Sequence, residues 1–186
     1  MTSRSSPRSS PRSSPLRAQM DIDGPLGRMT AAATDAGVAG LWFHDQKHRP
    51  ESVDAPVDPT HPHLVRLADE LHAYWRGEPG GFSVPLDLQG TPFQRAVWQA
   101  LLEIAAGRTM SYGALAERIG QRSAVRAVGA AVGRNPVSIV VPCHRVVGAD
   151  GSLTGYDGGL HRKQDLLRRE GSAPSHGGDL FEQAAP

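Results

Sequence analysis

The chain has 186 residues, of which 39% are hydrophobic, and this is enough apolar sequence for one ordinary domain or two small ones. A single cysteine excludes an internal disulfide framework, and no cysteine and histidine cluster has the spacing of a structural zinc site, so we expect no metal and a reducing, cytoplasmic setting. No uninterrupted apolar stretch approaches the length of a membrane span, so no membrane partner is expected.

The formal net charge of +1 is unevenly distributed along the chain. Residues 18–90 carry eleven acidic and five basic side chains, whereas residues 91–171 carry eleven basic and six acidic ones. A positive surface attracts the phosphate backbone of nucleic acids, although this excess is weak evidence when taken alone.

The chain begins with low-complexity sequence, in which Arg-Ser-Ser-Pro occurs three times between residues 4 and 15. This sequence has no apolar residues to bury, so we predict a disordered tail over residues 1–19. Its arginines could touch nucleic acid weakly, but a dispensable tail is the simpler interpretation.

Residues 20–87 are predicted to form a small α+β domain. Apolar runs separated by turn residues predict strands over residues 28–34 and 38–43, and apolar residues at helical spacing predict a helix over residues 63–75. The histidines of this region are irregularly spaced, so we interpret them as solvated rather than as metal ligands. They are His44, His48, His61, His63 and His72.

Residues 88–171 are predicted to form a second, mainly helical domain, followed by a flexible tail over residues 172–186. Thr91 is a suitable N-cap with Pro92 in the first turn, and Ser111 is a suitable cap for a second helix ending at Ile119. A third helix is predicted over residues 123–134 after a short turn. Helix, short turn and helix give the outline of a helix-turn-helix.

The third helix is built almost entirely from small residues, among them Ala124, Ala127 and Gly129, with Arg126 as the one long cation in their midst. A helix of this kind can pack closely against another helix in the core. It can equally approach a narrow DNA groove, where proteins commonly insert a side chain and unstack the duplex. The composition alone favours neither alternative.

The only cysteine follows a run of aliphatic residues and precedes His144 and Arg145. We predict a short buried strand over residues 139–148, broken by Pro142, that places Cys143 beside these two potential cations. Such a setting converts a thiol into a thiolate nucleophile. The competing interpretation is an inert core cysteine, which is the more frequent case.

Two polar residues on either side of Cys143 occupy noteworthy places. Asn135 precedes Pro136 and can act simply as a helix stop. Glu170 ends a predicted helix over residues 160–170, where the helix macrodipole disfavours a carboxylate. A negative charge at that place is better explained if it holds a cation or a histidine.

The helices, turns and polar residues described above follow one another along the chain in the order seen in one known family. Over about residues 88–171 the chain resembles the O6-alkylguanine-DNA alkyltransferases, also called methylated-DNA–protein-cysteine methyltransferases. The resemblance rests on Pro142-Cys143-His144-Arg145-Val146 together with Asn135-Pro136, Phe93 through Trp98, Ser111-Tyr112-Gly113, Arg126-Ala127-Val128-Gly129, Gly155-Tyr156, Gly158-Gly159, Leu166-Leu167 and Glu170-Gly171.

The resemblance implies a role for each matching residue near the cysteine. Cys143 corresponds to the alkyl acceptor, and His144 to the base, bridged to the thiol by a water. Glu170 would orient that histidine, and Asn135 would brace the active-site turn against the helix-turn-helix. This arrangement of thiol, base and orienting group is typical of activated nucleophiles.

The resemblance also implies a pocket for a flipped base and a surface for DNA. Tyr112 would stabilise guanine as a leaving group, the carbonyls of Cys143 and Val146 would accept from the exocyclic amine, and Tyr156 would close the pocket wall. Asp157 departs from the family, which often has Ser or Gly there, so a donor at this position would have to be the backbone N–H. Arg126 would fill the gap left by the extruded nucleotide, and the DNA surface would also include Ala124, Ala127, Gly129 and Arg134.

The sequence therefore predicts an α+β protein, with a small N-terminal module and a mainly helical C-terminal domain that carries a helix-turn-helix and the active-site cysteine. The expected function is repair of O6-alkylguanine, with O4-alkylthymine as a further candidate substrate, in duplex DNA bound through its minor groove. Transfer to Cys143 would be irreversible, and we expect a monomer without a cofactor. The alternatives are a non-catalytic alkyltransferase-like protein that binds lesions, and a cysteine hydrolase.

Overall fold

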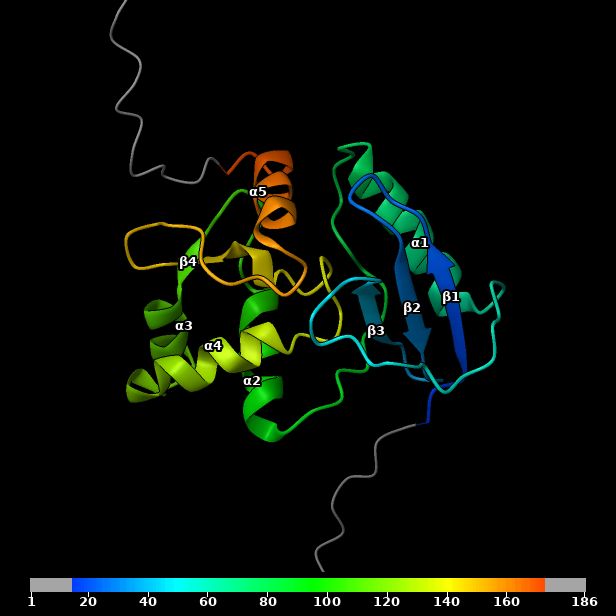
Figure 1. The fold of residues 1–186 in the computed structure, drawn as a ribbon, viewed down its shortest axis with the longest axis horizontal. Helices are drawn as coiled ribbons and strands as arrows, with labels where there is room; N and C mark the ends of the chain where they lie inside the picture. The colour runs from blue at the N-terminus through cyan, green and yellow to red at the C-terminus, as the bar shows by residue number, and fades with distance from the viewer. Residues whose placement is uncertain (1–14, 173–186) are drawn as a thin grey trace, which may run out of the picture.

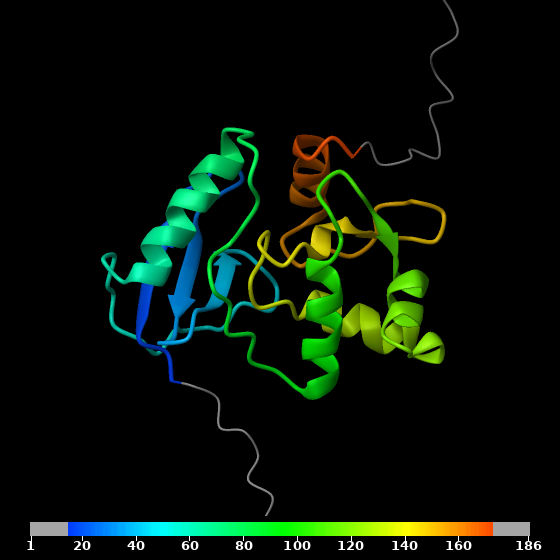
Figure 2. The same cartoon turned by 180° about the vertical axis from the view of Figure 1, so that it is seen from behind.

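The computed structural model describes residues 15–172, which form an α+β structure of two parts lying side by side (Figures 1 and 2). The N-terminal part contains a three-stranded sheet and one helix, and the C-terminal part is mainly helical. The predicted tails before residue 15 and after residue 172 lie outside the described residues. No helix within residues 15–172 is long and apolar enough to cross a membrane.

The sheet pairs β1 (Ala18–Ile22), β2 (Met29–Ala33) and β3 (Val38–Phe43) in antiparallel order. β2 and β3 confirm the two predicted strands. The predicted tail boundary at residue 19 is wrong, because β1 already begins at Ala18, which is buried and pairs with Ala33. Pairing with β2, rather than an apolar pattern of its own, places this strand.

Helix α1 (Pro62–Trp75) lies across one face of the sheet (Figure 1) and confirms the predicted helix. Leu64, Leu67 and Leu71 recur at helical spacing and are fully buried. Burial of such a side chain stabilises the fold by about 1.5–3 kcal/mol. The last turn of α1 ends beside the C-terminal part, where Tyr74 and Trp75 pack edge to face.

The edge of β3 joins the two parts through the backbone. The amide of Leu41 donates to the carbonyl of Pro136 at 2.8 Å, and the amide of Ser138 donates to the carbonyl of Leu41 at 2.9 Å. The segment that leads to Cys143 is therefore attached to the N-terminal sheet.

The C-terminal part begins with α2, whose start follows the predicted signals. Thr91 caps α2 through a capping box, in which its hydroxyl accepts from the Gln94 amide and its amide donates to the Gln94 side chain. Ser111 caps α3 by accepting from the amide of Ala114. The elements of this part are α2 (Pro92–Leu102), β4 (Met110–Ser111), α3 (Tyr112–Arg118), the 3₁₀ turn η1 (Arg122–Ala124), α4 (Val125–Gly133), the 3₁₀ turn η2 (Cys143–Arg145), β5 (Val146–Val147) and α5 (Leu160–Arg169).

The predicted strand over residues 139–148 is wrong for most of its length. Ile139 has a φ of 72°, a left-handed conformation that is uncommon for a β-branched residue. The amide of Val141 donates to the carbonyl of Val137 at 3.0 Å, so the chain folds into a compact turn. Only β5 pairs as a strand, in parallel with β4. The aliphatic residues are buried as predicted, but in a turn.

Candidate active site

Cys143 lies at the start of η2, directly after this turn, and its side chain is buried. Burial raises the pKa of the thiol to about 11, although the hydrogen bond from Asn135 and the charge of Lys163 act in the opposite direction. The free protein therefore carries a thiol rather than a thiolate at this position. The thiol needs a base before it can act as a nucleophile.

Asn135 connects the cysteine to the turn that precedes it. Its side-chain amide donates to the carbonyl of Val141 at 2.8 Å and to the sulfur of Cys143 at 3.0 Å, and its carbonyl oxygen accepts from the amide of Val137 at 3.0 Å. Asn135 is buried and follows α4 closely. Its side chain thus fixes the turn and the thiol together.

His144 is fully buried and donates from Nε2 to Oε1 of Glu170 at 2.8 Å. Burial lowers the pKa of His144, although Glu170 opposes this shift, so the imidazole is neutral. With Nε2 as the donor, Nδ1 carries the free lone pair. This nitrogen is buried and has no hydrogen-bond partner within residues 15–172, so it is the atom that can accept a proton.

Glu170, at the C-cap of α5, is held by charged and polar groups from two other elements. Arg145 binds it through both oxygens, with Nε to Oε2 at 2.7 Å and Nη2 to Oε1 at 2.9 Å, and Tyr74 donates to Oε1 at 2.9 Å. Burial alone would raise the pKa of Glu170, but the hydrogen bonds from His144 and Arg145 lower it to about 2. The carboxylate is therefore ionised throughout the neutral range.

The loop before α5 forms one wall of a small pocket beside the thiol. A cavity of about 10 Å³ is lined by Cys143, Asn135, Tyr156 and Asp157, among others. Burial raises the pKa of Tyr156 well above its ordinary value, so its hydroxyl remains protonated. Tyr112 reaches the same loop, where its hydroxyl lies 3.4 Å from the carbonyl of Gly155.

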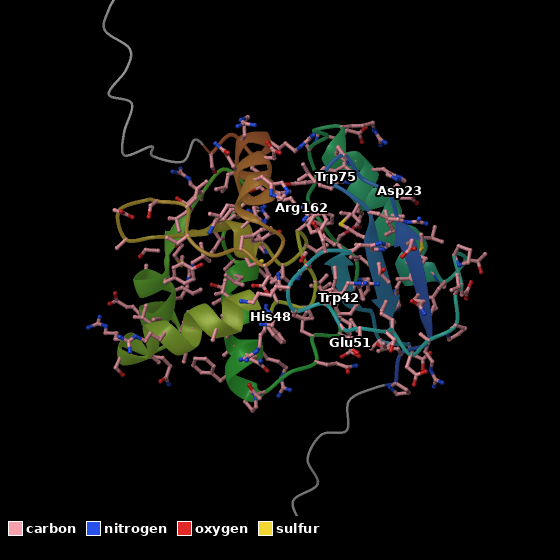
Figure 3. All side chains as sticks on the ribbon, in the orientation of Figure 1. Asp23, Trp42, His48, Glu51, Trp75 and Arg162 are labelled. Carbon is pink, nitrogen blue, oxygen red and sulfur yellow. The ribbon has the colours of Figure 1, made fainter. Side chains whose placement is uncertain are left out.

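Asp157 bonds to His48 from the N-terminal part, and the amide of Lys47 donates to the carbonyl of Asp157 at 3.2 Å. Figure 3 shows His48 between the sheet and the helical part. The residue that departs from the family pattern is thus held by a loop that precedes it by more than a hundred positions.

Lys163 is a buried cation without a carboxylate partner within the described chain. Its ammonium donates to the carbonyls of Val146 at 2.5 Å and Thr154 at 2.7 Å. Burial lowers the pKa of Lys163 to about 8. The Val146 carbonyl, which the resemblance assigns to the base, therefore already accepts one hydrogen bond from Lys163.

The residues assigned to DNA lie on α4 and at its ends. Val128, Ala131 and Val132 are buried, and Trp98 of α2 donates to the carbonyl of Ala131 at 2.8 Å. The opposite face exposes Arg126, Ala127 and Arg134, while Ala124 and Gly129 are half-buried. One face of the small helix therefore packs in the core as predicted, and the approach of its exposed face to DNA stays a prediction.

Comparisons with known proteins identify relatives of this arrangement. The family described as 6-O-methylguanine DNA methyltransferase, DNA binding domain, matches residues 92–172. The methylated-DNA–protein-cysteine methyltransferase of Mycobacterium bovis is 45% identical over 161 residues, which cover 87% of this chain and 96% of the relative. The chain belongs to the methylated-DNA–protein-cysteine methyltransferase family. A relative from Mycolicibacterium paratuberculosis is 48% identical over 80% of this chain and 89% of its own length.

Solved structures of this methyltransferase family share the fold. A crystal structure of Mycobacterium tuberculosis OGT in complex with DNA has a TM-score of 0.76 and 46% sequence identity, and covers 85% of this chain and 96% of that chain. A crystal structure of the Mycobacterium tuberculosis O6-methylguanine methyltransferase has a TM-score of 0.74 at 45% identity, and covers 87% of this chain and 95% of that chain.

Sequence reasoning missed several residues of the methyltransferase site. Arg145 stood beside the cysteine but was not assigned to Glu170. Lys163 gave a weak signal, as a cation next in helical spacing to the buried Leu166 and Leu167. Tyr74 gave none, because its contact with Glu170 spans 96 positions.

Proposed function

We propose that this chain repairs duplex DNA by transferring an alkyl group from O6 of guanine to Cys143, once per molecule. Membership of the methylated-DNA–protein-cysteine methyltransferase family supports DNA repair by alkyl transfer, with DNA as the partner. Two hydrogen bonds support the residue assignment: Asn135 donates to the sulfur of Cys143, and the neighbouring His144 donates to Glu170.

The first step is removal of the thiol proton. Cys143 is protonated at neutral pH, and the free lone pair of His144 lies on Nδ1. The family arrangement implies a water that carries the proton from Sγ to Nδ1. Glu170 remains ionised and stabilises the imidazolium that results, as an orienting acid does in other nucleophilic sites.

The thiolate then attacks the alkyl carbon on O6. A carbon–sulfur bond forms, the carbon–O6 bond breaks, and the electron pair of that bond enters the guanine ring. A proton donated toward the base offsets this charge, and Tyr112 is the residue assigned to that task. Its pKa is raised by burial, so the hydroxyl carries its proton at neutral pH.

Access to O6 requires the base to leave the stack. The exposed face of α4 carries small side chains around Arg126, which permits close approach to the minor groove with Arg126 reaching inward. Asn135 follows α4 by two residues and donates to the sulfur of Cys143, so a short connection joins the proposed DNA surface to the thiol.

The product is a thioether, which is a poor leaving group. Cys143 is the only cysteine of the chain, so no second thiol can remove the adduct. The protein is therefore consumed by one reaction.

The test is intact-protein mass after incubation with duplex DNA that contains one O6-methylguanine. The wild-type protein should gain the mass of one methyl group, confined to the Cys143 peptide, and never more than one per molecule. Cys143→Ala should bind the same duplex without any gain. Label on Cys143→Ala would exclude Cys143 as the acceptor, and lesion binding without any gain by the wild type would favour the lesion-binding alternative.

A further inference from the structure

The carboxylate of Glu170 receives three hydrogen bonds on one oxygen. Oε1 accepts from His144 at 2.8 Å, from Arg145 at 2.9 Å and from the hydroxyl of Tyr74 at 2.9 Å. His144 and Arg145 come from η2, but Tyr74 comes from the last turn of α1 in the N-terminal part. It is the one side chain of that part bonded to the His144–Glu170 pair within residues 15–172.

The Glu170 carboxylate borders a cleft, so it has a second possible orientation besides the one against His144. A cleft of about 620 Å³ between the two parts is lined by Tyr74, Phe82, Arg145 and Glu170, among others. A carboxylate turned toward this cleft would gain water and lose its contact with His144. The Tyr74 hydroxyl bonds the carboxylate in its position against the imidazole.

The Tyr74 hydroxyl keeps its proton in the neutral range and can therefore always donate a hydrogen bond. It is half-buried, and burial and the neighbouring Glu170 raise its pKa, so it does not ionise in the neutral range. Its ring is fixed by Trp75 at 5.1 Å and by Phe82 at 5.5 Å between ring centroids. The donor is therefore held in place by its own packing.

We propose that Tyr74 is a positioning residue for alkyl transfer, which acts through Glu170 on His144. This inference rests on the proposed function and assigns the N-terminal part a direct share in the reaction. The hydroxyl fixes the carboxylate against Nε2.

The charged groups around Glu170 define what a pH profile reports. Tyr74 faces the carboxylate from α1, and His144 and Arg145 face it from η2. Arg169 and Glu78 line the same cleft, and the charge of Lys163 also acts on His144. Only His144 among these groups is expected to limit the rate on the acid side, because it must be neutral to accept the thiol proton.

The test compares Tyr74→Phe with the wild type in single-turnover transfer at saturating DNA. Loss of the hydroxyl should slow transfer about tenfold, the lower end of what a hydrogen bond to a charged group contributes. The acid limb of the pH profile should move to lower pH by roughly half a unit or more, since a carboxylate turned toward the cleft no longer stabilises the imidazolium. The Kd for the duplex should not change.

His72→Gln is the matched control, because His72 is exposed in the same last turn of α1 and lies outside the packing of Tyr74. It should leave the rate and the pH profile in place. In a Glu170→Gln background, Tyr74→Phe should cause little further loss, since both act through one carboxylate. An unchanged rate and pH profile in Tyr74→Phe, with the wild type active, would overturn the inference alone; an inactive wild type would instead overturn the proposed function.

Discussion

Glu170 is placed where a carboxylate is intrinsically unfavourable, because it ends a helix and its side chain is only 3% exposed. The bidentate contact from Arg145 and the bond from His144 outweigh these costs, because the net effect is a lowered pKa. The sequence suggested that such a charge needs a cation or a histidine to hold, and Glu170 holds both.

This pairing predicts a specific loss of stability in acid. The folded pKa of about 2 lies below the ordinary value of 4.5, so the stabilisation is fully present above pH 4.5 and is lost as the pH falls toward 2. Glu170→Gln should lower the free energy of unfolding by on the order of 3 kcal/mol at pH 7. In urea titrations, its difference from the wild type should shrink steadily between pH 5 and pH 3.

Asp165→Asn provides the control on the same helix. Asp165 is more exposed and pairs with Arg168, and surface pairs of this kind contribute roughly 0–1 kcal/mol. This variant should remain close to the wild type at every pH. A Glu170→Gln deficit of the same size at pH 7 and pH 3 would contradict the ionised, stabilising carboxylate.

The residues of the site were predictable to the extent that they lie within a recognisable motif. Cys143 and His144 are adjacent, and Glu170 ends the last predicted helix. Tyr74 and His48 could not be predicted, because each meets the site only through the packing of the two parts. A single sequence carries no signal for such a long-range contact.

At the scale of elements, helices with local start signals were the most predictable. The caps at Thr91 and Ser111 act within a few residues of the chain, so the sequence around them suffices. The turn before Cys143 was predicted as a strand because the groups that stabilise it lie outside the aliphatic run itself. Asn135 and the edge of β3 hold it, and neither is visible in an aliphatic run.

Helix α4 has one buried and one exposed face, and a larger residue on the exposed face should affect DNA binding but not stability. Ala127 is exposed, so Ala127→Leu should leave the melting temperature almost unchanged. If this face approaches DNA closely, the added side chain should clash and raise the Kd for lesion-containing duplex roughly tenfold or more, as for overpacking of 1–3 kcal/mol. Fluorescence anisotropy measures this Kd directly.

Ala96→Leu is the matched substitution, since Ala96 is an exposed alanine on α2. It should leave both the melting temperature and the Kd near their wild-type values. Equal binding by Ala127→Leu and the wild type would place the DNA surface elsewhere.

At the scale of the whole molecule, the two parts are joined at several places around the active site. The edge of β3 bonds to the segment before Cys143, and His48 holds Asp157. Arg162 of α5 pairs with Asp45 and lies 4.3 Å above the ring of Phe43, and Figure 3 shows it facing the N-terminal part. The sheet therefore supports the active-site loop as well as its own core.

The distribution of free cations makes a last prediction, for the salt dependence of DNA binding. Several basic residues of the C-terminal part are engaged internally, among them Arg145, Arg162 and Lys163. Arg134, at the end of α4, is exposed and forms no salt bridge within residues 15–172. Each phosphate contact contributes about −0.9 to the slope of log K against log salt concentration. Arg134→Ala should therefore make the slope less steep by about one.

Arg17 provides the control, because it is an exposed cation of the N-terminal part that pairs with Asp35. Arg17→Ala should leave the slope unchanged. An unchanged slope in Arg134→Ala would remove this residue from the phosphate contacts and direct the search to the other exposed cations of the C-terminal part.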